Sequence, residues 1–139
     1  MGLCAAIGLM GITATTTFAA DDKDHKEGGA VKPAGTVEGI MTQIHEHHME
    51  LAETVKNKKL ADVHHHAFAI RDLAKALPAK VPADDKAKVQ GTVNNIAKLA
   101  EALDQSGDAN DQAKTEANLK KLDGLIKMLE THSGKHDHK

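Results

Sequence analysis

The sequence TQIHEHHMELAETVKNKKLADVHHHAFAI, residues 42–70, holds six of the ten histidines of this 139-residue chain. They form two groups, His45/His47/His48 and His64/His65/His66. Neutral imidazole is a common ligand of zinc, copper and nickel. Two such groups would therefore form a transition-metal site if the fold brings them together.

The chain has a single cysteine, Cys4, so thiolate ligands for a metal are scarce. This residue lies in MGLCAAIGLMGITATTTFAA, residues 1–20, a segment with no charged side chain. An apolar run followed by small residues is typical of a secretory signal peptide. We expect this segment to be removed on export to the periplasm or beyond, so metal binding falls to histidine, methionine and carboxylates.

Four segments with helical spacing of apolar residues must position the histidines. They cover about residues 37–55, 60–77, 82–107 and 108–133; Pro78 ends the second, Ser106-Gly107 the third, and Asp108 caps the fourth. Because the connections are short, consecutive helices are expected to be antiparallel neighbours. The sequence predicts an all-α, up-down-up-down four-helix bundle over residues 36–134. A disordered leader, residues 21–35, precedes it, and a histidine-containing tail, residues 135–139, follows.

The first group of histidines lies on or beside the apolar stripe of the first helix. At about 100° per residue, His48 falls within the stripe, between Ile44 and Leu51. His45 and His47 flank it on opposite sides. His48 is therefore expected to point into the bundle, with the other two at its margins.

The second group has the same pattern on the second helix. His66 falls within the apolar face, His64 lies at its margin and His65 points outward. Folding the hairpin between the two helices puts His48 level with His66. We therefore predict a metal centre built on His48 and His66.

Other residues near this level are further candidate ligands. They are His45, His47, His64, Met41 and Glu50. Asp62, four residues before His66, is placed to orient its ring. The expected ion is divalent copper, nickel or zinc, or cuprous copper.

Two enzyme classes lack their motifs here. A zinc-protease helix needs a second histidine where Met49 stands, and the paired Glu-x-x-His of di-iron bundles is missing from the sequence. We therefore expect a binding protein rather than an enzyme.

Composition argues against other partners. The formal net charge is only −2, and Phe68 is the one aromatic side chain after the first twenty residues. Neither a strong positive field nor stacking platforms for bases are present, so nucleic acid is not expected as a partner. Membrane insertion after signal removal is not expected either. Phe68 is predicted to project away from the apolar face, where it could serve a structural or adaptor bundle.

The helix lengths and the predicted export resemble the cytochrome b562 / cytochrome c′ superfamily. The resemblance in architecture covers about residues 36–135. It implies haem b held by a methionine early in the first helix and a histidine near the end of the fourth, here Met41 and His132. Covalently attached haem is excluded because the chain lacks Cys-x-x-Cys-His.

The high histidine content is also similar to that of small periplasmic metal-binding four-helix proteins. That resemblance implies metal buffering, storage or delivery beside a metal efflux or delivery partner. Two functions therefore follow from the sequence: binding of copper, nickel or zinc, and, as the alternative, electron transfer by haem b.

Overall fold

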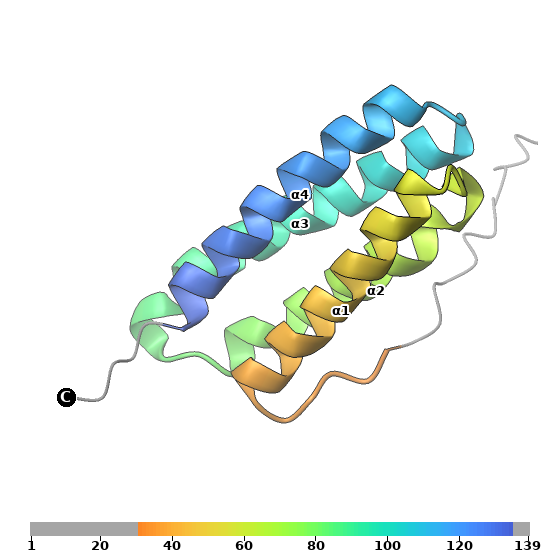
Figure 1. Ribbon diagram of the computed structural model, residues 1–139. Coiled ribbons are helices and arrows are strands. Elements are labelled where there is room, and N and C mark those ends of the chain that lie inside the picture. Colours follow the sequence, from red (N-terminus) through yellow and green to blue (C-terminus); the bar gives the residue numbers. More distant parts are fainter. Residues whose placement is uncertain (1–30, 135–139) are drawn as a thin grey trace, which may run out of the picture.

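A computed structural model describes residues 31–134, and this part of the chain consists of four packed α-helices with no strand (Figure 1). The helices are α1 (Val37–Lys56), α2 (Val63–Ala76), α3 (Ala83–Asp108) and α4 (Gln112–Ser133), with short 3₁₀ turns η1 (Leu60–Asp62) and η2 (Leu77–Ala79) around α2. The predicted all-α, four-helix arrangement is confirmed. The predicted signal peptide, most of the predicted leader and the tail lie outside the described residues.

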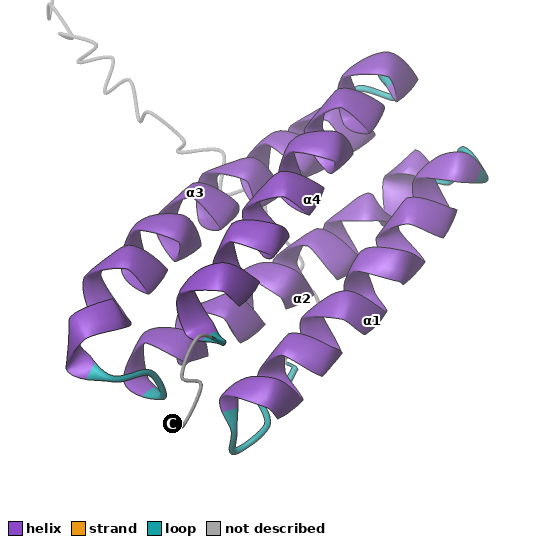
Figure 2. Cartoon of the chain, turned by 60° about the vertical axis from the view of Figure 1, so that its left-hand side comes forward, coloured by secondary structure: helices purple, strands orange, loops and turns teal. Residues whose placement is uncertain are grey.

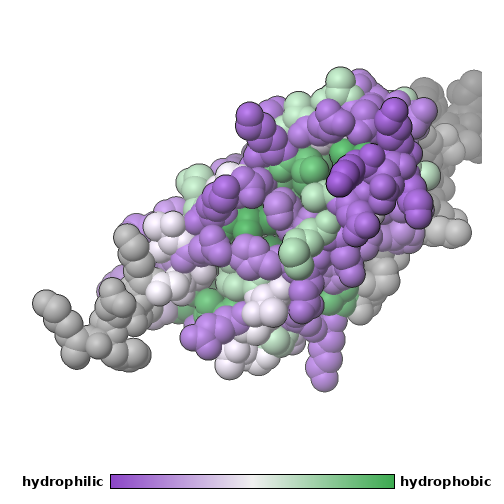
Figure 3. Space-filling view, viewed as in Figure 1, coloured by the Kyte–Doolittle hydropathy of each residue, from purple (hydrophilic) through white to green (hydrophobic). Residues whose placement is uncertain are grey.

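Each helix packs on the next one along the chain, and α1 also contacts α4, less extensively (Figure 2). Two polar bridges join α1 and α4. His45 Nε2 lies 2.7 Å from Glu130 Oε1, and the Gln112 side chain donates to the Val55 carbonyl at 2.9 Å. The face seen in Figure 3 is largely hydrophilic, with small apolar patches between the polar side chains. None of the helices within residues 31–134 is long and apolar enough to cross a membrane.

The boundary between α3 and α4 differs from the prediction. Ser106 and Gly107 do not end α3; they are buried within it, and the helix runs on to Asp108. The N-cap of α4 is Asp111, whose side chain accepts from the Lys114 N–H, and not Asp108. These small residues in the last turn also serve packing, because the Gly107 backbone lies against the carbonyl of Leu60.

The last residues of the predicted leader are held against α1. The Gln43 side chain accepts from the Ala34 N–H at 2.9 Å and donates to the Lys32 carbonyl at 3.1 Å. Val31 and Ala34 pack against the core. The expectation of a disordered leader up to residue 35 is therefore wrong for this part, since one amide side chain holds its backbone.

The predicted outward position of Phe68 is also wrong. Its side chain is only 7% exposed and belongs to the core, and the Arg71 guanidinium lies 4.5 Å from the ring centroid. The reason is that α2 packs against both α1 and α3, which gives it an apolar face wider than one stripe. The adaptor surface expected around Phe68 is therefore not exposed.

Two glycines of α3 provide a matched test of this packing. A Cβ added at Gly107 would lie 2.6 Å from the Leu60 carbonyl oxygen, whereas one at Gly91 would meet nothing within 4 Å. We expect Gly107→Ala to lower the free energy of unfolding by about 1 kcal/mol or more. Gly91→Ala should raise it by about 0.5–1 kcal/mol through helix propensity. Urea unfolding measures both, and a Gly107→Ala protein as stable as the parent would contradict the close approach.

Candidate metal site

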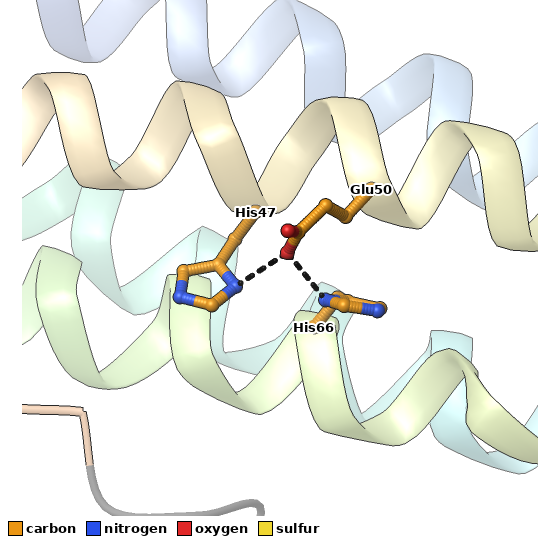
Figure 4. Close-up of side chains that lie close together, drawn as sticks. All are labelled: His47, Glu50 and His66. Carbon is orange, nitrogen blue, oxygen red and sulfur yellow. Dashed lines mark ion pairs between the residues drawn. The ribbon is translucent and has the colours of Figure 1, made fainter.

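Three side chains that can bind a metal converge between α1 and α2 (Figure 4). Glu50 Oε2 lies 3.3 Å from His47 Nδ1 and 3.2 Å from His66 Nδ1. His47 and Glu50 come from α1, and His66 comes from α2. Within residues 31–134 this is the group of three histidine or carboxylate ligands whose donor atoms all lie within 4.8 Å of one another.

The local structure explains why these residues meet. His47 and Glu50 are three residues apart on α1, so they lie on one side of the helix. The turn after α1 is tight: the Lys58 and Lys59 N–H groups donate to the carbonyls of Val55 and Thr54, and Lys58 adopts a φ of 58°. This turn returns the chain along α1 and places the first turns of α2 beside the middle of α1. His66 therefore lies opposite Glu50.

The spacing of the donor atoms suits a small transition-metal ion. In a tetrahedral site with metal–ligand bonds of roughly 2.0–2.1 Å, neighbouring donor atoms lie about 3.3 Å apart. The two distances from the Glu50 oxygen, 3.2 and 3.3 Å, match this spacing. Nδ1 of His47 is enclosed and makes no hydrogen bond despite its closeness to Glu50. The short distance is that of an ion pair between residues three apart on α1, without the alignment of a hydrogen bond.

The surroundings of His66 favour the form that binds metals. Burial lowers the pKa of His66 below its usual 6.5; the Glu50 carboxylate opposes this shift, and His47 and His65 reinforce it. The ring is thus held neutral, and a neutral imidazole has a lone pair for a metal. The side chains of His47 and His66 are 25% and 24% exposed and that of Glu50 is 58% exposed, so an ion there would remain accessible from solvent.

His48 lies in different surroundings and does not join this group. Burial lowers its pKa, Asp123 opposes the shift, and His45 and Lys127 reinforce it. Asp123 and Lys127 belong to α4, so His48 is on the side of α1 that faces α4. The structure therefore brings His66 together with His47 and Glu50 and not with His48, because adjacent residues on a helix point about 100° apart.

The other candidate residues also have separate contacts. His45 pairs with Glu130 of α4, while His64 Nδ1 lies 2.8 Å from the Ala61 carbonyl and its ring packs against His65 at 3.9 Å between centroids. Asp62, expected to orient His66, only weakly raises its pKa, and Glu50 has the closer contact.

The two residues of the haem alternative lie near the same end of the bundle. Met41 is 9% exposed and packs in the core near the start of α1. His132 is near the end of α4, where its Nδ1 lies 3.3 Å from the Thr92 hydroxyl of α3.

Glu50 has a more central place in this group than the sequence indicated. The sequence placed it among several further candidate ligands, yet its carboxylate lies next to both imidazoles. The signal was the His47-x-x-Glu50 spacing, which puts a nitrogen and an oxygen donor on one side of a helix.

Comparison with models of protein families, with curated proteins and with solved structures finds no match to this chain. The resemblance to the cytochrome b562 / cytochrome c′ superfamily is therefore supported only as an all-helical, four-helix arrangement.

The lowered histidine pKa values make a prediction about the metal-free protein. For His48 and His66 the pKa in the folded protein lies below 6.5, the pKa in the unfolded chain. Such a group contributes stability that is fully present above pH 6.5 and is lost as the pH falls through its pKa in the folded protein. We expect the free energy of unfolding, measured with a chelator present, to decrease as the pH falls below about 6.5. His48→Gln should weaken this dependence because it removes one of the two groups.

The exposed His65 supplies the control for that measurement. His65→Gln should change the dependence of stability on pH less than His48→Gln does, because His65 is only one of the smaller causes of the lowered pKa of His66. An equal slope in the parent and in His48→Gln would show that burial of His48 does not affect its protonation.

Proposed function

We propose that this protein binds a divalent transition-metal ion (copper, nickel or zinc) through His47, Glu50 and His66. The observation that carries the proposal is a single carboxylate oxygen that lies 3.2–3.3 Å from the Nδ1 atoms of two imidazoles on adjacent helices. A set of two nitrogens and one hard oxygen favours divalent ions over cuprous copper, which prefers soft sulfur ligands.

The role that fits this site is buffering, storage or delivery of the ion by an exported up-down-up-down bundle. A structural zinc site has four protein ligands and is closed, whereas three ligands at a partly exposed site leave a position open. An ion bound there can be exchanged with a partner, such as a component of metal efflux. The function proposed is binding without catalysis.

Ligand substitutions test the site directly. Loss of a residue that only orients a metal ligand weakens metal binding by roughly 10- to 100-fold. We expect His47→Gln, Glu50→Gln and His66→Gln each to weaken binding of Cu²⁺, Ni²⁺ or Zn²⁺ by at least this factor. Isothermal titration calorimetry of the full chain gives the affinities. Thermal unfolding with and without the ion should show a stabilisation in the parent that these variants lose.

Two other histidines serve as matched controls. His65→Gln removes an exposed imidazole next to His66, and His48→Gln removes the inward-facing imidazole next to His47. Both variants should retain most of the metal affinity. If His48→Gln abolishes binding while His47→Gln does not, the centre lies on the other side of α1 and this proposal fails.

The alternative function, electron transfer by haem b, rests on the adjacency of two helix ends. The contact between His45 and Glu130 shows that the early part of α1 lies beside the late part of α4, which carry Met41 and His132 respectively. A methionine and a histidine are an axial pair used for haem in electron carriers.

A visible spectrum separates the two functions. Protein purified from cells supplied with haem should show no haem absorption if the metal site is the functional one, and elemental analysis should find copper, nickel or zinc. A haem band that Met41→Ala or His132→Ala removes would favour the electron carrier instead.

A further inference from the structure

A polar cavity of about 300 Å³ adjoins the candidate metal site. It extends from the site towards the turn after α1. Its lining residues are Glu50, Glu53, Thr54, Asn57, Lys59 and His66. Two of the three candidate ligands, Glu50 and His66, therefore also form one wall of a space that a small molecule can enter.

We propose that this cavity binds a small amino acid once a divalent ion is bound, with the amino acid completing the coordination of the metal. The inference rests on the proposed metal site and adds to it the class of ligand that the site takes from solution.

The first argument is coordination. Three protein ligands leave one position of a tetrahedral zinc ion unfilled and a second when the ion becomes five-coordinate, and they leave more for copper or nickel. Glu50 and His66 line the cavity, so an ion held by them would lie at its edge. A ligand in the cavity would be within reach of the metal.

The second argument is charge. Without metal the cavity wall carries two carboxylates, Glu50 and Glu53, against one ammonium group, Lys59. A divalent ion reverses the sign of the local charge, so that an anionic group is attracted only in the metal-loaded protein. Binding of the small molecule should therefore depend on the metal.

The third argument is the pairing of opposite charges within the cavity. The Lys59 ammonium can hold a carboxylate, and the Glu53 carboxylate can accept from the N–H groups of a coordinated amine. The Thr54 hydroxyl and the Asn57 amide add neutral hydrogen-bonding groups. An α-amino acid has both groups and chelates a metal through them, releasing its ammonium proton as it binds.

The cavity of about 300 Å³ has room for a small ligand. It is open to solvent, with Glu53, Asn57 and Lys59 exposed, and it admits glycine or another small amino acid.

Equilibrium dialysis with radiolabelled glycine tests the proposal on the full chain. We expect the Zn²⁺-loaded protein to retain glycine and the chelator-treated protein to retain none. Lys59→Met should weaken glycine binding by about two- to fivefold, the range for a partly exposed charge pair. The affinity for Zn²⁺, measured without glycine, should not decrease in this variant.

Lys56→Met is the matched control, because Lys56 is an exposed lysine in the last turn of α1 that does not line the cavity. It should bind glycine as the parent does. Retention of glycine without metal, or equal losses in the Lys56 and Lys59 variants, would overturn the assignment. If Zn²⁺ binds but glycine is not retained, this inference fails and the proposed metal site stands; if Zn²⁺ does not bind, both fail.

Discussion

The tight turn between α1 and α2 is the constraint on which the rest of this structure depends. Backbone hydrogen bonds to Thr54 and Val55 close the turn, and Lys58 takes up a left-handed conformation to allow it. The apolar residues on both sides, such as Val55 and Leu60, are buried, so the two helices cannot slide past each other without exposing them. The level at which His66 meets Glu50 is thus set by packing that involves neither residue.

The structure divides the first histidine group between two neighbours of α1. His47 faces α2 and takes part in the candidate metal site, whereas His48 faces the charged side chains of α4. Burial lowers the pKa of both His48 and His66, so these imidazoles are held in the neutral form at little cost near neutral pH. Of these two histidines, only His66 belongs to a group whose three donor atoms all lie within 4.8 Å of one another.

Sequence periodicity was sufficient to predict four helices and their approximate bounds, because the apolar residues recur clearly at helical spacing. It was not sufficient to place single residues at the edges of the apolar stripes. Phe68 and His48 show why: a helix in a bundle contacts two neighbours, so its buried face is wider than one stripe and the stripe alone does not say which neighbour a marginal residue meets. Ser106 and Gly107, predicted to end the third helix, lie in its last turn one residue before its end, and their burial was not foreseen because small residues both stop helices and permit close packing. The sequence therefore indicated which helices carry the candidate ligands, but not which of these side chains lie together.

All three candidate ligands belong to one helical hairpin, and this affects how tightly metal binding and folding are linked. An ion held by His47, Glu50 and His66 would cross-link a short stretch of chain and leave α3 and α4 untouched. Closing a short loop removes little conformational freedom from the unfolded chain. The core shared by all four helices does not include these ligands, so loss of an ion bound there would leave the packing of the bundle unchanged. Such a protein would cycle between loaded and empty forms without refolding, unlike small zinc domains that unfold when the metal is lost.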